Sequence, residues 1–185
     1  LWQANLAPEV KPYPGCHRLH GVDVVPLSVL LQTLTAAARE AGAAAVSDVR
    51  FEHPIVVDRP RAIQVLAADG SVTVSSRAGS DAPWIRHAGG RLAPCAPDGD
   101  HPAPAATGEA ETRSITELFE EWGVEGQPFP WSIDALRHTP GGAVADLALA
   151  GPAEPSVVAL LDAAVHAARL VDRDNPRLLV PSGVG

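Results

Sequence analysis

Two stretches of the chain carry apolar residues at helical spacing. In the first half, five apolar residues fall at i, i+3, i+4, i+7 and i+11. They are Leu27, Leu30, Leu31, Leu34 and Ala38. Pro26 suits the first turn of a helix, and Gly42 can end it. Because alanine fills most of the remaining positions, the pattern predicts a helix that is buried on all sides.

A second apolar helix is predicted over Ser156 to Val171, with Ser156 as its cap. A shorter helix is predicted over Ser114 to Trp122. Ser114 stands at the N-cap position, and Glu117 stands three residues later, as in a capping box. The apolar face of this segment is formed by Ile115, Leu118, Phe119 and Trp122.

The segments between the helices alternate between apolar and polar residues, as β-strands do. Asp69-Gly70 and Pro140-Gly141-Gly142 are turn signals, and each marks the tip of a predicted hairpin. The predicted strands are Gln3–Leu6, Val46–Val57, Ile63–Leu66, Val72–Ser76, Trp84–Leu92, Phe129–Ala135, Ala143–Leu149 and Leu178–Val180.

The order of elements predicts two units of similar design, each with one buried helix and several strands. Residues 1–95 form the first unit, and residues 113–185 form the second. Residues 96–112 are rich in Pro, Ala and Gly, and we interpret them as a linker. Only one strand is visible after the second buried helix, so we expect the second unit to be partial.

Composition excludes several classes of protein. The formal net charge of −8 argues against nucleic-acid binding, which depends on clustered basic residues. Cys16 and Cys95 are too few for a disulfide framework or a four-ligand zinc site, so we expect no metal and a cytoplasmic setting. Neither a membrane-spanning run nor a signal peptide is visible. The chain opens on Leu1 and contains no methionine, which favours a domain of a longer polypeptide.

Candidate chemistry lies next to the two buried helices. His17 precedes the first helix, with Gly21 four residues later and Pro26 five beyond that. Asp162 and His166 lie one turn apart on the second helix and therefore share a face. A histidine can act as a base near neutral pH, and a carboxyl group kept protonated by burial can act as an acid.

These residues resemble the two motifs of dehydratase domains from type I polyketide synthases. His17, Gly21 and Pro26 match the His-x-x-x-Gly-x-x-x-x-Pro motif, and Leu160 to His166 is similar to the motif Asp-x-x-x-Gln/His. The resemblance implies an α+β double hot-dog fold, in which two antiparallel sheets are each wrapped round a central helix. It implies elimination of water from a β-hydroxyacyl thioester, with His17 as the base and Asp162 as the acid.

The same resemblance implies the partners of the domain. The substrate would be carried on the phosphopantetheine of an acyl carrier protein, and the domain itself would bind no cofactor and no metal. Gly21, Val25, Pro26 and His166 would contact the substrate. Other domains of the same synthase would be partners, and a homodimer formed through the synthase is compatible with this interpretation. A membrane or nucleic-acid partner is not expected.

The chain departs from the usual dehydratase pattern at two places. Leu27 follows the motif proline where most such domains have glycine, and the segment Trp122 to Phe129 replaces their Tyr-Gly-Pro-x-Phe motif. The run from His20 to Pro26 is closer to iterative synthases of the 6-methylsalicylic or orsellinic acid type. That branch implies an alternative, thioester hydrolysis and product release on the same fold. A third hypothesis is a catalytically inactive structural domain of the synthase.

Overall fold

The computed structural model describes residues 1–94, 108–139, 142–150, 156–171 and 183–184. The chain divides into two compact units, each with its own internal packing. The first unit consists of Leu1–Pro14, Val22–Asp98 and Pro181–Gly185. The second consists of Gly15–Gly21 and Gly99–Val180. The short segment around His17 therefore belongs with the second unit, although it precedes most of the first in sequence.

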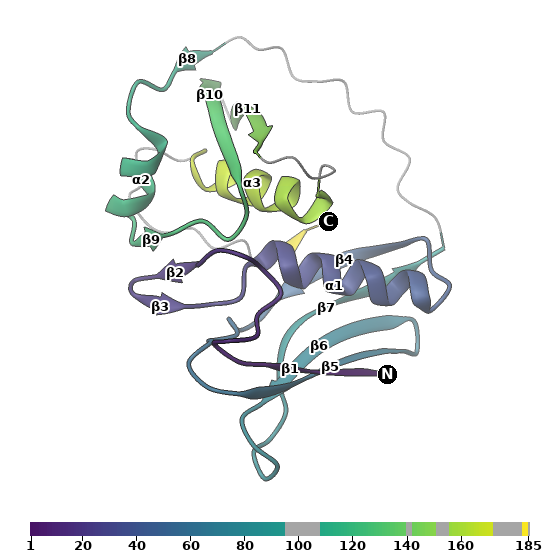
Figure 1. Ribbon diagram of the computed structural model, residues 1–185. Helices are drawn as coiled ribbons and strands as arrows, with labels where there is room; N and C mark the ends of the chain where they lie inside the picture. The colour runs from purple at the N-terminus through teal and green to yellow at the C-terminus, as the bar shows by residue number, and fades with distance from the viewer. Residues whose placement is uncertain (95–107, 140–141, 151–155, 172–182, 185) are drawn as a thin grey trace. The chain divides into compact units, whose positions relative to one another are not determined.

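The first unit is built on an antiparallel sheet in the order β1-β5-β6-β7-β4-β12. The central strands are ribbons beneath helix α1 in Figure 1. The sheet strands are β1 (Trp2–Leu6), β4 (Ala45–Phe51), β5 (Arg61–Ala68), β6 (Ser71–Arg77), β7 (Ile85–Ala93) and β12 (Gly183–Val184). A short strand, β3 (Val22–Asp23), precedes the helix.

Helix α1 (Leu27–Glu40) supplies the core of the first unit, and its start directly after Pro26 is as predicted. Leu30, Leu34 and Ala38 are buried and lie on the side that packs against β4, β5, β6 and β7. The prediction of burial on all sides is wrong, because Gln32 and Arg39 are exposed. One face of the helix is therefore solvated, as in most helices that cover one side of a sheet.

The turns of the first unit follow the sequence signals. Asp69 and Gly70 both have positive φ and connect β5 to β6, which confirms the predicted hairpin. Strand β4 ends at Phe51, so the strand predicted over Val46–Val57, with a kink or edge feature at His53-Pro54, is too long. A register shift interrupts β4 at Asp48, whose φ is +51°. The chain leaves the sheet after Phe51, because Pro54 follows and proline lacks the N–H that a ladder needs.

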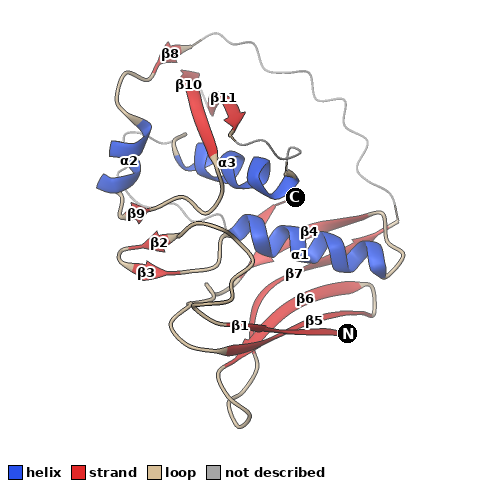
Figure 2. Cartoon of the chain, viewed as in Figure 1, coloured by secondary structure: helices blue, strands red, loops and turns tan. Residues whose placement is uncertain are grey.

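Within its described residues, the second unit contains two helices, a three-stranded antiparallel sheet and a further antiparallel strand pair, drawn as blue helices and red strands in Figure 2. Strands β11, β10 and β8 form one sheet, and β2 pairs with β9. Helix α3 packs against β10 and β11. The elements are β2 (Arg18–Leu19), β8 (Glu109–Ala110), α2 (Ile115–Glu121), β9 (Val124–Glu125), β10 (Trp131–Thr139), β11 (Gly142–Leu149) and α3 (Val157–Arg169).

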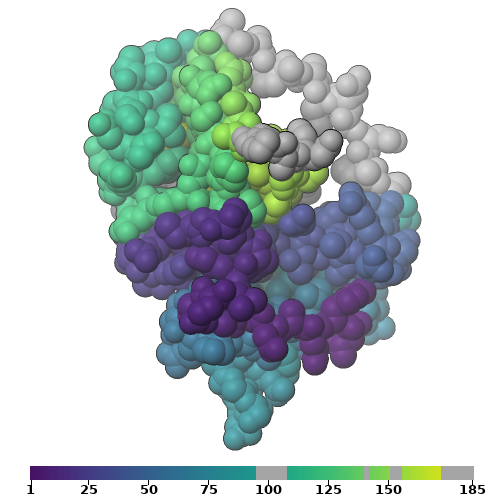
Figure 3. All heavy atoms as spheres, in the orientation of Figure 1, coloured from purple at the N-terminus to yellow at the C-terminus, as the bar shows by residue number. Residues whose placement is uncertain are grey.

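The core of the second unit lies beneath helix α2. Leu118, Phe119 and Trp122 of the helix region are buried with Leu136 of β10 and Leu170 after α3. The predicted short helix is thus confirmed, and Ser114 caps it by accepting a hydrogen bond from the Glu117 N–H at 3.5 Å. In the space-filling view, the teal atoms of α2 lie directly against the green atoms of β10 (Figure 3).

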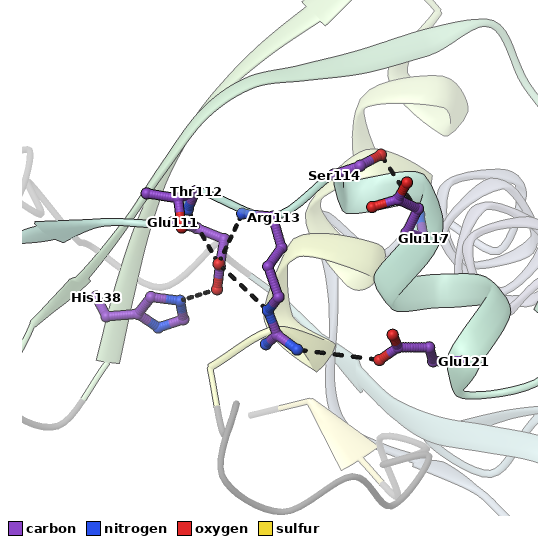
Figure 4. Close-up of polar contacts among 7 residues, drawn as sticks. All are labelled: Glu111, Thr112, Arg113, Ser114, Glu117, Glu121 and His138. Carbon is purple, nitrogen blue, oxygen red and sulfur yellow. Dashed lines mark hydrogen bonds and ion pairs between the residues drawn. The ribbon is translucent and has the colours of Figure 1, made fainter.

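A polar cluster around Glu111 leads the chain into α2 (Figure 4). One carboxylate oxygen of Glu111 accepts hydrogen bonds from the backbone N–H groups of Thr112 and Arg113, each at 3.0 Å. The other oxygen lies 3.4 Å from Nε2 of His138 on β10. These contacts lower the pKa of Glu111, with the Arg113 N–H bond as the largest cause. Glu111 therefore ties the start of α2 to β10.

Several predicted features fall on residues whose structure is not described. These are Leu178–Val180, Pro140-Gly141 and most of the linker 96–112. Within that linker stretch, Glu109–Ala110 is strand β8. The boundaries 1–95, 96–112 and 113–185 therefore stay a prediction. No described helix has both the length and the apolar character needed to cross a membrane.

A buried histidine lies in the sheet of the first unit. His87 accepts a hydrogen bond at Nε2 from the hydroxyl of Ser76, at 2.7 Å, and donates from Nδ1 to the carbonyl of His53, at 3.0 Å. Burial lowers its pKa below the ordinary value of 6.5, and the charge of Arg61 adds to this effect. The imidazole is therefore neutral near pH 7, because burial disfavours its charged form.

We expect this histidine to make the folded state less stable in acid. The pKa of His87 is lower in the folded than in the unfolded chain. The contribution of the neutral His87 to the free energy of unfolding is therefore fully present above pH 6.5, and it is lost as the pH falls from 6.5 through the folded pKa. Urea unfolding at about pH 7.5 and about pH 5 measures the loss, which should be smaller in His87→Gln. The exposed His20 provides the control His20→Asn. An equal acid loss in wild type and His87→Gln would contradict the prediction.

Candidate active site

Three ionisable residues occupy one face of helix α3. Asp162, His166 and Arg169 stand at i, i+4 and i+7, a spacing that brings side chains onto the same side of a helix. All three are buried, with exposed fractions of 1%, 2% and 2%. Ionisable groups are rarely buried so completely unless they have partners or a function. This face of α3 is therefore the first candidate for a reactive site.

Trp131, at the start of β10, fixes the carboxyl group of Asp162. Its indole Nε1–H donates a hydrogen bond to Oδ2 of Asp162 at 2.8 Å. Nδ1 of His166 lies 3.5 Å from the same oxygen. The stronger bond of His166 goes to the backbone, because Nδ1 lies 2.8 Å from the carbonyl oxygen of Asp162. That carbonyl can only accept, so Nδ1 carries the proton and Nε2 is left as an acceptor.

His17 enters the same site from the segment Gly15–Gly21. It is 2% exposed, and its ring lies edge-on to that of His166, with centroids 5.7 Å apart. The pairing of β2 with β9 begins at the next residue, and the N–H of Gly15 donates to the carbonyl of Pro128 at 3.0 Å. These backbone bonds hold the histidine from both sides. The structure thus places His17, Asp162 and His166 together within one unit.

Aromatic rings surround His166. The ring of Phe119 stands nearly perpendicular to it, with centroids 5.3 Å apart, and that of Trp131 is tilted at 5.0 Å. Aromatic neighbours exclude water and lower the local dielectric, which strengthens the electrostatic interactions among the buried charges. The arrangement combines a carboxyl group and two imidazoles in a dry environment, which is suited to proton transfer.

The charges of the site act on one another. Burial lowers the pKa of His166 to about 4, and the nearby positive charge of Arg169 adds to this effect. His166 is therefore neutral near pH 7. Burial also lowers the pKa of Arg169, while the negative charge of Asp162 raises it. Within the described part of the chain, neither Nε2 of His166 nor Nε and Nη1 of Arg169 has a hydrogen-bond partner.

A cavity of about 530 Å³ opens beside His166 within the second unit. Its wall includes Phe119 of α2, Trp131 and Ser132 of β10, and Gln127 of the preceding loop. His166 is the histidine in this lining, so a molecule in the cavity would meet its ring. The volume lies in the range of small-molecule sites.

The remaining predicted site residues lie elsewhere. Gly21 ends the His17 segment in an exposed turn with φ of +79°, a conformation that favours glycine. Val25 and Pro26 belong to the first unit. The N–H of Val25 donates to the carbonyl of Ile55 at 2.9 Å, and the carbonyl of Pro26 accepts the N–H of Val29 at 3.1 Å. Their contact with substrate stays a prediction.

Trp131, Phe119 and Arg169 were not among the residues that the sequence pointed to. Arg169 could have been found from helical register, because it continues the face of Asp162 and His166. The two aromatic residues carry no such signal, since alternation or helical spacing alone marks each as a core residue. Among the described residues, no group of three or more His, Cys, Asp and Glu side chains is arranged to hold a metal ion.

Known proteins resemble this chain over its whole length. Residues 1–79 match the family model for the polyketide synthase dehydratase domain. One subunit of the phenolphthiocerol/phthiocerol polyketide synthase of Mycobacterium tuberculosis (strain H37Rv) is 42% identical over 199 residues, which cover 100% of this chain and 11% of that protein. The 6-methylsalicylic acid synthase of Aspergillus terreus is 28% identical over 211 residues, with the same coverage. The chain thus spans about a tenth of these relatives.

Solved dehydratase structures show the same fold. GphF Dehydratase 1 superimposes with a TM-score of 0.75 at 22% identity, over 98% of this chain and 72% of that one. The dehydratase domain from the CurF module of the curacin polyketide synthase gives 0.71 at 20% identity, over 99% and 74%. The predicted α+β double hot-dog fold is confirmed, and the chain covers about three quarters of these domains. The chain is thus similar to the dehydratase domain of polyketide synthases, in sequence over residues 1–79 and in its fold.

Proposed function

We propose that this domain removes water from a β-hydroxyacyl thioester carried on the phosphopantetheine of an acyl carrier protein. The observation that carries the proposal is the group formed by His17, Asp162 and His166, buried together in one unit of a domain with the dehydratase fold. Dehydration needs one group that accepts a proton and one that donates a proton, and a dry site supports both.

Each step of the reaction has a residue to perform it. His17 takes the proton from the carbon next to the thioester carbonyl, and the electron pair of that C–H bond forms the new double bond. The C–O bond to the β-hydroxyl breaks, and Asp162 protonates the departing oxygen to give water. Proton transfer from protonated His17 to the carboxylate of Asp162 then restores the starting state. Both residues are thus regenerated, and no redox partner is needed.

His166 has a different role in this scheme, that of a substrate-binding residue. Its lowered pKa keeps it neutral, so it does not supply the proton. Its Nε2 is an acceptor in a ring that lines the cavity, and a hydroxyl or amide N–H of the substrate is a suitable donor. Gly21, Val25 and Pro26 are proposed as further substrate contacts on the strength of the family resemblance alone.

A second candidate function is thioester hydrolysis with release of a free acid. Two observations favour it: the similarity to 6-methylsalicylic acid synthase over the whole chain, and the segment Trp122 to Phe129, which replaces the Tyr-Gly-Pro-x-Phe motif of most dehydratases. In this reaction a water molecule attacks the thioester carbon and His17 takes its proton. The C–S bond then breaks, and the phosphopantetheine sulfur leaves as a thiol by taking that proton back from His17. Both functions use the same histidine but differ in the product.

The partners follow from the relatives, which are large multidomain synthases. We propose the acyl carrier protein and the other domains of the synthase as partners, in the cytoplasm, with a homodimer as the assembly to test. The reaction as written needs no cofactor in the domain besides the phosphopantetheine that carries the substrate.

Mass spectrometry of carrier-bound substrates tests the proposal. A β-hydroxyacyl carrier should lose water with wild type, and the rate should fall about 100- to 10,000-fold in His17→Ala and Asp162→Asn, because each removes a proton-transfer group. The exposed His20 gives the control His20→Asn, which should retain activity. Hydrolysis of a carrier-bound aromatic acyl chain without dehydration would instead support the second candidate. If a folded domain acts on neither carrier, the structural-domain hypothesis replaces both.

The charge of Arg169 provides a separate prediction. Replacing it in Arg169→Met should raise the pKa of His166 above its value of about 4, because a nearby positive charge disfavours the imidazolium. The pKa should stay below 6.5, since burial is the larger cause and persists. NMR titration of the His166 ring, assigned with His166→Gln, measures it. Arg137→Met on β10 is the matched control. An unchanged pKa of His166 in Arg169→Met would contradict the prediction.

A further inference from the structure

Trp131 is the residue of the site that neither motif includes. It is the first residue of β10, where its backbone pairs with Leu149 of β11. Its carbonyl accepts a hydrogen bond from the side-chain amide of Gln127. Pro128 and Pro130 precede it, and each proline ring fixes its own φ. The indole is therefore attached to a well-held part of the unit.

The side chain of Trp131 contacts both Asp162 and His166 of α3. The indole N–H donates to Oδ2 of Asp162 at 2.8 Å, and the indole ring lies at a centroid distance of 5.0 Å from the ring of His166. Trp131 and His166 both line the cavity of about 530 Å³. A movement of Trp131 would consequently disturb the carboxyl group, the imidazole and the cavity wall together.

The chemistry of the indole suits it to orienting an acid. Its N–H is a donor only and exchanges no proton with the reaction near neutral pH. When Asp162 is protonated, the oxygen that accepts from Trp131 is its carbonyl oxygen, so the acidic proton resides on Oδ1. The proton for the departing hydroxyl would then come from Oδ1. An acid held in one orientation avoids the loss of rate that misalignment causes.

We propose that Trp131 is a positioning residue for Asp162, which assigns Oδ1 as the oxygen that delivers the proton. This inference rests on the proposed function for its catalytic consequence, but the hydrogen bond itself can be tested without turnover. The bond also stabilises the ionised carboxylate relative to the acid, as a donor to an anion does. Its loss should let the carboxyl group keep its proton to higher pH.

Trp131→Phe tests the proposal through kinetics. The variant keeps an aromatic ring against His166 but lacks the N–H donor. We expect kcat for dehydration to fall about 10- to 100-fold with little change in KM, because the acid is present but misaligned. The alkaline limb of the kcat profile should move to higher pH. Trp84→Phe is the matched control, since that indole stacks on Arg77 in the first unit. The proposal would be overturned if Trp131→Phe had the wild-type kcat and the alkaline limb of its pH profile stayed at the wild-type position.

An isosteric replacement separates orientation from packing. β-(3-Benzothienyl)alanine at position 131 preserves the shape of the ring and replaces only the N–H by sulfur. It should reproduce the kinetic loss of Trp131→Phe. A benzothienyl variant with full activity would show that Trp131 acts only through packing.

NMR of the indole N–H groups provides a readout that needs no substrate. The chain has four tryptophans, and the Trp131 signal is assigned by its absence in Trp131→Phe. In Asp162→Ala this signal should move upfield, because its charged acceptor is lost, while Asp146→Ala on β11 should leave it in place. An unmoved Trp131 signal in Asp162→Ala would refute the hydrogen bond. A moved signal in a domain without dehydratase activity would reject the proposed function and retain the contact.

Discussion

The second unit depends on how it keeps three ionisable side chains of one helix face out of water. Asp162, His166 and Arg169 are almost fully buried, and an isolated charge in such a place would cost several kcal/mol. The indole N–H of Trp131, the backbone carbonyl of Asp162 and the opposite charges of Asp162 and Arg169 offset that cost. These supports come from β10 and from α3 itself, so the site exists only when the strand and the helix are packed together.

The two buried helices differ in the kind of residue that each one buries. The buried face of α1 is formed by Leu30, Leu34 and Ala38, and no ionisable residue of that helix is buried. The buried face of α3 also contains apolar residues, but it includes Asp162 and His166. Helix α1 therefore stabilises the first unit through apolar packing, whereas α3 gives part of its packing surface to reactive groups.

Sequence patterns predicted much of this arrangement. Apolar periodicity located α1 and α3 because a helix against a sheet must repeat at about 3.6 residues. The Asp69-Gly70 hairpin and the Ser114 cap were equally local signals. The separation of Gly15–Gly21 from the rest of the first half was not predictable, because it depends on the pairing of β2 with a strand more than a hundred residues away.

The sequence pointed to three ionisable residues of the candidate site but not to Trp131 and Arg169, which contact them or act on them through charge. His17, Asp162 and His166 stand in recognisable spacings, and such spacings can be found by inspection. Trp131 contacts Asp162 from a different element, so only the folded chain brings them together. Arg169 lay in the register of α3 but looked like an ordinary basic residue at a helix end, a position that usually faces water.

The central claim is that His17 and Asp162 act as one site in one reaction. A double-mutant cycle tests it most directly: kcat/KM for dehydration of a carrier-bound β-hydroxyacyl chain is measured for wild type, His17→Ala, Asp162→Asn and the double variant. Residues that act as a unit are not additive, so the double variant should lose about as much activity as the more damaged single variant. Losses that multiply across the two changes would show that the residues act independently, which contradicts the account.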